Sequence, residues 1–388
     1  MLLAAHQASD EHRVAALDRL RAFAVFLVIG HHAAWRFRPD GADPLAQVMK
    51  GAGWIGVDIF FVISGFMITA ILLRDGGDIR GFFVRRFYRI VPLFVVAVAV
   101  FAALAAATGL GAEKLGLIWS PALLLNGWTI PFLGYGKVPY TITWSLSVEE
   151  AAYLAMGLAC LAGRKGLIAT LAAFMVIGPV TRVVALATGA IDPFELYFFV
   201  PARLDTIAFG GLAALLAQRG ARARPWMAWI AGLAVVVLIV AYRYLSVAMP
   251  AMVLAGYSVF GLATGWFVFS LATLDAARGE GTGRAARAAS FVSRGVGSIT
   301  ARFGRVSYFI YLFHIFVLEA LLQAQRWFPT ARLGYWQALA LATAIVFGLA
   351  VLSWRWFERP LIRRGRDVSL GGRKQNVLRA DDRGVSAS

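Results

Sequence analysis

The sequence has 388 residues, of which 60% are apolar and only 15% are charged, with a mean hydropathy of +0.71. A soluble domain carries nearer a quarter charged residues, so this composition excludes an ordinary soluble protein. The net charge is +17, but the basic residues do not cluster on a soluble domain as they do in nucleic-acid-binding proteins. We therefore expect no nucleic-acid partner. The single cysteine, Cys160, excludes an internal disulfide and a cysteine-based zinc site, and we predict no bound metal.

Mainly apolar runs of about 20 residues, the length that spans a bilayer as a helix, recur along the whole chain. They predict an all-α, polytopic integral membrane protein with about ten transmembrane helices. The candidate spans lie near residues 20–37, 54–73, 90–109, 142–162, 167–187, 202–218, 226–245, 250–272, 306–325 and 335–357.

The distribution of Lys and Arg predicts how these helices are oriented. The stretch 110–141 is partly apolar but is broken by Pro121 and Pro131. If it does not cross, 27 of the 38 Lys and Arg residues lie on the side of the N-terminus, 8 on the other side and three within helices. Because positive charge concentrates on the inner side, both termini are expected to be cytoplasmic. The stretch 110–141 is then an outer loop or a re-entrant piece buried by protein.

Composition divides the chain into three parts. Residues 1–19 are expected to form a cytoplasmic N-terminal segment, and residues 20–362 the transmembrane domain. The tail 363–388 is basic and polar, which predicts a disordered cytoplasmic segment. Segment 273–305, rich in Gly, Ala and Arg, is expected to be a cytoplasmic linker.

Ionisable side chains within apolar spans are costly and are therefore functional candidates. In the first span, His32 follows Arg21 by eleven residues, which places it about 16 Å from Arg21 toward the outer face. A backbone carbonyl that satisfies the imidazole is the structural alternative. His31 points about 100° away around the helix, so the two histidines are not expected to share a site. Asp58 lies one turn into the second span, and Ser64 lies near its middle.

Two adjacent carboxylates lie two turns into the fourth span. Trp144 lies near the start of the same span. Glu149 and Glu150 are expected about 10 Å from the outer face, at the depth of His32 and Asp58. A histidine near carboxylates is a plausible general-base arrangement. Stabilisation of a helix amino terminus would explain one exposed glutamate there, but not two at this depth.

Other polar residues are candidates for binding substrate. Arg86 and Arg89 are three apart and share a helical face, which suits a polyanionic ligand such as phosphate. Inner-face anchoring is the alternative. Arg203 opens the sixth span, and Tyr311 shares a helical face with His314 in the inner half of the ninth span.

In this order, the motifs resemble the acyltransferase-3 family of bacterial membrane O-acyltransferases. The resembling segments, LDRLRAFAVFLVIGHH, GVDIFFVISGF, VRRFYRIVP, TWSLSVEEAAYL, SYFIYLFHIF and SWRWFERP, cover about residues 17–362. The sequence departs from the family at Ala151 and Ala152, where a Gln-Phe pair is common, which leaves the shape of the acceptor pocket open. The family's motifs fall on Arg21, His32, Arg86, Arg89, Glu149 and Glu150.

The resemblance implies transfer of an acyl group, commonly acetyl, from cytoplasmic acyl-CoA to a hydroxyl of a carbohydrate or glycolipid on the outer side of a bacterial inner membrane. No bound cofactor is implied, because acyl-CoA is the donor substrate. His32 is then the general base or acyl relay, oriented by Glu149 or Asp58, with the arginine pair holding the donor.

Two other classes of protein remain as alternatives. A transporter of a glycan or lipid could use the same intramembrane charges, but the chain shows no internal repeat, which disfavours a transporter built from repeated halves. A non-catalytic membrane scaffold would not need a histidine at this depth.

The predicted topology can be tested with reporter fusions. A reporter at the C-terminus should read cytoplasmic, and one inserted within 188–200 should read external, because of the positive-inside bias. An internal signal from the 188–200 insertion would overturn the ten-helix topology and indicate that 110–141 crosses the membrane.

Overall fold

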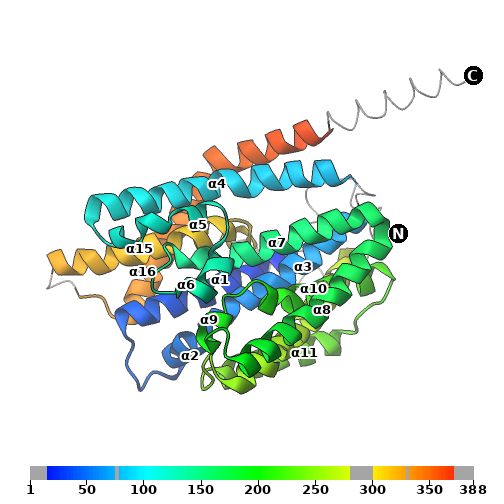
Figure 1. Cartoon of the computed structure of the whole chain (residues 1–388), viewed down its shortest axis with the longest axis horizontal. Coiled ribbons are helices and arrows are strands. Elements are labelled where there is room, and N and C mark those ends of the chain that lie inside the picture. Colours follow the sequence, from blue (N-terminus) through cyan, green and yellow to red (C-terminus); the bar gives the residue numbers. More distant parts are fainter. Residues whose placement is uncertain (1–14, 75–77, 280–299, 329–331, 371–388) are drawn as a thin grey trace, which may run out of the picture.

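The computed structural model describes residues 15–74, 78–279, 300–328 and 332–370, and this part of the chain is helical without strands (Figure 1). Each predicted span has a corresponding helix of at least 15 residues in one bundle. These helices are α1 (Ala15–Phe37), α3 (Gly56–Arg74), α4 (Ile79–Thr108), α7 (Trp144–Ala159), α8 (Gly163–Thr188), α10 (Leu204–Gln218), α11 (Pro225–Tyr242), α12 (Tyr257–Gly279), α15 (Ser307–Trp327) and α16 (Tyr335–Ser353).

Seven segments of the described residues are long and apolar enough to cross a membrane, one of which contains both α7 and α8. The helices α1 and α10 lie outside these segments. Helix α10 has only 15 residues, and α1 carries charged side chains near both ends. Both are packed by other helices, α10 by α3, α8 and α12, and α1 by α3, α15 and α16. Since protein rather than lipid surrounds them, they tolerate shorter length and more polar residues.

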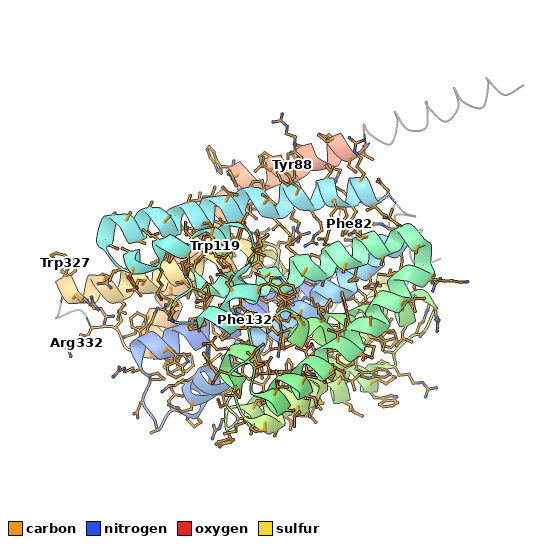
Figure 2. All side chains as sticks on the ribbon, in the orientation of Figure 1. Phe82, Tyr88, Trp119, Phe132, Trp327 and Arg332 are labelled. Carbon is orange, nitrogen blue, oxygen red and sulfur yellow. The ribbon has the colours of Figure 1, made fainter. Side chains whose placement is uncertain are left out.

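The outer surface of the bundle is apolar, as a lipid-facing surface must be. Trp119, Phe132 and Trp327, which are labelled in Figure 2, come from three different elements and have exposed fractions of 44%, 68% and 81%. Trp229 of α11 and Leu352 of α16 are similarly exposed. The composition and the surface together identify a multi-pass membrane protein.

Helices α3 and α10 cross in direct backbone contact. A Cβ atom on Gly65 would lie 1.9 Å from the carbonyl oxygen of Ile207, and one on Gly210 would lie 1.9 Å from that of Val62. Only glycine permits this reciprocal approach, as in other close crossings of membrane helices.

Two buried ion pairs link α10 and the turn before it to α3 and α8. The Arg203 guanidinium donates to Asp58 Oδ1 and lies 3.9 Å from the centre of the Tyr257 ring. Arg182 of α8 binds both carboxylate oxygens of Asp205, at 3.0 and 2.8 Å. The four charged side chains are at most 1% exposed. Charges without access to water must be paired, so these contacts specify how α3, α8, α10 and α12 pack.

The stretch 110–141 forms no spanning helix. It contains short helical turns, including α5 (Trp119–Ala122) and α6 (Asn126–Leu133), folded against the bundle. The buried Asn126 amide donates to the carbonyl oxygens of Pro139 and Tyr140 and to Thr143 Oγ1, at 2.8–3.1 Å. Gly127 N donates to Ser147 of α7 at 3.1 Å. Helix α7 therefore begins beneath this folded segment.

The chain between α1 and α3 also folds inward. Helix α2 (Pro44–Ala52) is capped at its amino end by Asp43, which accepts hydrogen bonds from the Leu45 and Ala46 amides. The Ala46 amide and the indole of Trp336 lower the pKa of the Asp43 carboxyl. The turn after α2 reaches α1, where a Cβ on Gly56 would lie 2.3 Å from the Ala24 carbonyl oxygen.

The prediction that the tail is disordered is wrong for residues 363–370. Helix continues beyond α16 through a π-helical turn (Trp354–Glu358) to Leu370, alongside α4 (Figure 1). Arg85 Nη1 donates to Ser369 Oγ at 2.6 Å, and this contact with α4 stabilises a polar helix that sequence composition alone does not predict. The predicted segment 1–19 and the rest of the tail lie largely outside the described residues, as does most of the predicted linker.

The Asp58–Arg203 pair gives a stability prediction. Asp58→Ala should destabilise the protein by about 3–5 kcal/mol, because it leaves a buried guanidinium uncompensated. Asp58→Leu combined with Arg203→Met should be much less costly, since neither charge remains. Thermal unfolding of the purified protein in detergent measures both, with Glu113→Gln, at an exposed position, as the control. An Asp58→Ala variant as stable as wild type would show that the pair does not hold α3 in place.

Candidate active site

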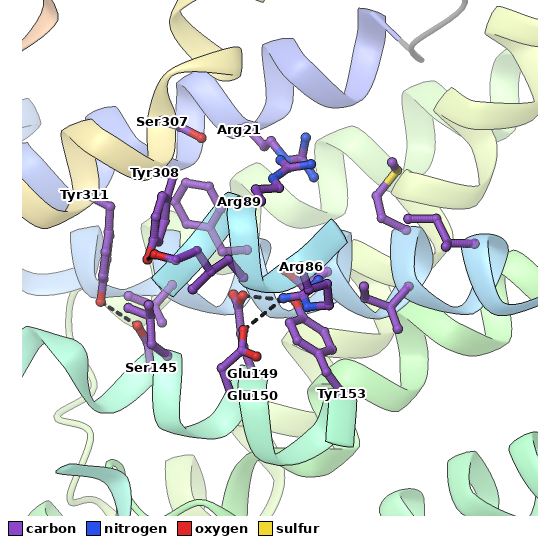
Figure 3. A pocket seen from close by; sticks show the side chains of 18 residues that line it. Arg21, Arg86, Arg89, Ser145, Glu149, Glu150, Tyr153, Ser307, Tyr308 and Tyr311 are labelled. Carbon is purple, nitrogen blue, oxygen red and sulfur yellow. Dashed lines mark hydrogen bonds and ion pairs between the residues drawn. The ribbon is translucent and has the colours of Figure 1, made fainter. Parts of the chain in front are cut away.

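A small polar cavity of about 130 Å³ lies among α1, α3, α4, α7 and α15 (Figure 3). We call it the arginine cavity. It gathers predicted candidates from five helices that are distant in sequence. Its polar lining residues are Arg21, Ser64, Arg86, Arg89, Ser145, Glu149, Glu150, Tyr153, Ser307, Tyr308 and Tyr311.

The central charge of this cavity is Arg86. Its Nη2 donates to Glu150 Oε1 at 2.9 Å, and its guanidinium carbon lies 3.5 Å from the centre of the Tyr153 ring. The Tyr153 hydroxyl donates in turn to Glu149 Oε2 at 2.9 Å. These contacts hold the guanidinium in one orientation (Figure 3). Arg89, on the same face of α4, also lines the cavity and is exposed.

A much larger cavity of about 900 Å³, which we call the histidine cavity, lies toward the other end of α1 and α15. Both His31 and His32 line it, so the prediction that the two histidines face different sites is wrong. Their rings contact edge to face with centroids 5.4 Å apart. The cavity is wide enough to reach both side chains despite their angular separation on α1. Trp144 and Tyr311 also line it.

His32 is held by a second histidine. Nε2 of His314 lies 3.1 Å from Nδ1 of His32, which also lies 3.0 Å from the Val28 carbonyl oxygen. Nδ1 of His314 faces the carbonyl oxygens of Tyr311 and Ile310, at 2.7 and 3.1 Å. Helices α1 and α15 run parallel, since Arg21 lies near Ser307 in the arginine cavity while the histidines meet further along. His314, predicted to bind substrate, is fully buried and contacts His32 instead.

The hydrogen bonds determine where the protons are. Carbonyl oxygens only accept, so Nδ1 of His314 carries a proton and Nε2 of His314 is an acceptor. His32 Nδ1 faces two acceptors and therefore donates. Nε2 of His32 remains unprotonated, on a ring that lines the cavity. An imidazole oriented in this way is chemically able to act as a general base, with a second imidazole in the position where other enzymes place a carboxylate.

One wall separates the two cavities. Val57 and Tyr311 are lining residues of both. The Tyr311 hydroxyl lies 2.7 Å from Ser145 Oγ and donates to the Ile142 carbonyl oxygen at 2.7 Å. Only side chains such as those of Val57 and Tyr311 therefore separate a group bound in one cavity from a group bound in the other.

The predicted common depth of the histidine and the carboxylates is wrong. Glu149 and Glu150 line the arginine cavity, because α7 starts beneath the segment 110–141 and not at the surface. Asp58 lies just beyond Gly56, which touches Ala24 of α1, eight residues before His32. Eight residues correspond to about 12 Å along a helix. No carboxylate of the described residues bonds to His32.

Asp58 and Arg203 lie in neither cavity. They bind each other inside the bundle, so the structure contradicts Asp58 as the orienter of His32 and gives Arg203 a structural contact in place of a substrate. Sequence reasoning also missed residues of the histidine cavity that come from loops and short helices, among them Lys50, Lys114 and Arg243. They follow no motif, and the only signal for them is positive charge on the predicted outer side.

The chain is similar to several bacterial proteins. It is 30% identical over 231 residues to a Bacillus subtilis protein provisionally named a peptidoglycan O-acetyltransferase, an alignment covering 54% of this chain and 34% of that protein. It is 34% identical over 155 residues to a peptidoglycan O-acetyltransferase of Listeria monocytogenes, covering 36% of this chain and 23% of that protein. The chain thus matches only about a quarter to a third of the length of these relatives. No solved structure matches it.

A family comparison covers nearly the whole described bundle. The domain described as "Acyltransferase domain" matches residues 14–355, which include every helix that lines the two cavities. The chain therefore belongs to the acyltransferase-3 family.

Proposed function

We propose that this protein is a membrane O-acetyltransferase that binds acetyl-CoA at the arginine cavity and acetylates a hydroxyl bound in the histidine cavity. The observation that supports this most directly is the pairing of His32 with His314 beside a large cavity, one side-chain wall from a cluster of arginines. With the predicted topology, the arginine cavity faces the cytoplasm, where acyl-CoA is made, and the histidine cavity faces the outer side of a bacterial inner membrane.

The size of the arginine cavity suggests how the donor binds. Its volume of about 130 Å³ is below the range of roughly 300–1,000 Å³ that is usual for small-molecule sites. That space suits an acetyl thioester but not a nucleotide, so the phosphates would remain at the mouth, near the exposed Arg89. Guanidinium groups bind phosphate through charge-assisted, often bidentate hydrogen bonds. Arg86, held by Glu150, would contribute a positive charge that needs no reorganisation.

The chemistry follows from the tautomer of His32. Nε2 of His32 would take the proton of the acceptor hydroxyl while its oxygen attacks the acetyl carbon. The new C–O bond forms, the C–S bond breaks, and coenzyme A leaves as a thiolate that receives the proton. The His314 imidazole would stabilise the imidazolium form of His32 by accepting from Nδ1 throughout. For the acetyl carbon and the hydroxyl to meet, the Tyr311 side chain would have to swing out of the wall.

The relatives indicate the class of acceptor. Two carry names that refer to peptidoglycan, a carbohydrate polymer outside the cell membrane. We therefore propose that the acceptor of this protein is also a carbohydrate, or a glycolipid. A glycan or lipid transporter is less well supported, because a wall divides the two cavities and the sequence shows no repeat.

The role of His32 predicts a loss of activity. His32→Gln keeps similar bulk and hydrogen bonding but cannot take a proton, so acetyl transfer should fall by at least about a hundredfold. The acetyl-transfer activity of His314→Leu should be about 10- to 100-fold lower, because one charge-assisted hydrogen bond is lost. His314→Gln should retain more activity, since its amide oxygen can still accept a hydrogen bond. The measurement is release of coenzyme A from acetyl-CoA with an oligosaccharide acceptor in reconstituted membranes.

His31→Gln is the matched control, since it lines the same cavity without contacting His314, and its effect should be much milder. Near-normal activity in His32→Gln would leave the proposed mechanism without a base. Equal losses in His314→Gln and His314→Leu would show that His314 fills space and does not orient His32.

The arginines predict a change in donor affinity. Arg86→Ala combined with Arg89→Ala should raise the KM for acetyl-CoA on the order of a hundredfold, since two charge-assisted hydrogen bonds are together worth roughly 3 kcal/mol. Arg80→Ala, an exposed residue of α4 outside the cavity, should leave the KM unchanged. If the double variant keeps the wild-type KM, the arginines act only as topology anchors.

A further inference from the structure

The histidine cavity is lined by positive charge that the proposed reaction does not use. Arg36, Lys50, Lys114 and Arg243 are among its lining residues. No Asp or Glu appears among the lining residues in the described part of the chain. The cavity therefore carries four cations without an acid in its wall.

Three of these cations have no carboxylate partner among the described residues. Lys50 Nζ lies 5.3 Å from the centre of the Trp35 ring, and Arg243 donates to the Tyr244 hydroxyl. Lys114 has no acidic contact either. Of the four cations, only Arg36 forms an ion pair with a described residue, with its Nε 3.6 Å from Glu319.

These cations come from separate parts of the chain. Arg36 lies near the end of α1, Lys50 lies on α2, Lys114 lies in a 3₁₀ turn (Ala112–Leu117), and Arg243 follows α11. On the predicted outer side, only 8 of the chain's 38 Lys and Arg residues occur, and these four are half of them. The positive-inside bias works against basic residues there, and like charges gathered around one cavity repel one another. Packing does not explain the cluster, but a bound anion would.

The rest of the lining fits a sugar. Aromatic rings surround the same space, among them Trp35, Trp54, Trp144, Tyr197 and Tyr244. Such rings offer flat apolar faces with a polar edge, which suits the mixed surface of a saccharide. The volume of about 900 Å³ lies within the range of small-molecule binding sites, roughly 300–1,000 Å³.

We propose that the acceptor is an anionic saccharide, a sugar unit that carries a carboxylate or a phosphate. Its anionic group binds Lys50, Lys114 and Arg243, its ring packs on the aromatic wall, and its free hydroxyl lies at His32. The inference rests on the proposed function for the identity of the histidine cavity as the acceptor site, but binding of the saccharide requires no catalysis.

Equilibrium binding to the full-length protein in nanodiscs, without acyl donor, tests the proposal. The probes are a glucuronate-containing tetrasaccharide, the same tetrasaccharide with its carboxylates reduced to alcohols, and a phosphorylated analogue of the reduced form. The wild type should bind at least one anionic probe about tenfold or more tighter than the neutral one, and added salt should weaken that preference. The two anionic arms distinguish a carboxylate from a phosphate.

The triple variant Lys50→Gln, Lys114→Gln and Arg243→Gln should lose the preference while keeping its affinity for the neutral probe. The matched control removes the same charge at Arg38, Lys137 and Arg332, which are exposed and outside the cavity, by substitution to Gln. Equal binding of all three probes by wild type, or the same loss in the control, would overturn the proposal. His32→Gln should still prefer the anionic probe. Anionic preference without acetyl transfer by wild type would refute the proposed function and leave the binding site standing.

Discussion

The ion pair between Asp58 and Arg203 fixes the helix on which both cavities depend. It holds one face of α3 against α10, where reciprocal glycines bring the two backbones into contact. Another face of α3 then presents Val57 to both cavities and Ser64 to the arginine cavity. In a bilayer no water is at hand to compensate a misplaced charge, so one buried pair determines the rotation of the whole helix.

The polar groups of this bundle fall into two classes with different physics. Paired charges such as Arg182 and Asp205 are fully enclosed and satisfy each other, which is how structural charges survive inside a membrane protein. Residues such as His32 and Lys50 line the histidine cavity, so a ligand there could reach their polar atoms. Position within a span does not distinguish the two classes, because Asp58 and His32 both lie within predicted spans. Access to a cavity does.

The wall at Tyr311 suggests how the proposed reaction can join two compartments without an open channel. The tyrosine is anchored by hydrogen bonds to Ser145 and to the Ile142 carbonyl, both near the start of α7. That start is set by the segment 110–141 folded over it, so the loop that the sequence left undefined helps to define the barrier. An enzyme that keeps its donor and acceptor on separate sides needs such a side-chain barrier more than it needs a fixed pore.

The sequence by itself determined the helical class, the number and approximate bounds of the long helices, the family, and most of the polar residues that line the arginine cavity. These follow from local apolar runs and from spacing along single helices, such as Arg86 and Arg89 on one face of α4. Tertiary structure alone decided which charges meet. Glu149 lines the arginine cavity because α7 begins below the surface. Asp58 binds Arg203 because the chain before α3 folds inward. His32 meets His314 because α1 and α15 run parallel, a contact across 282 positions that no local pattern encodes.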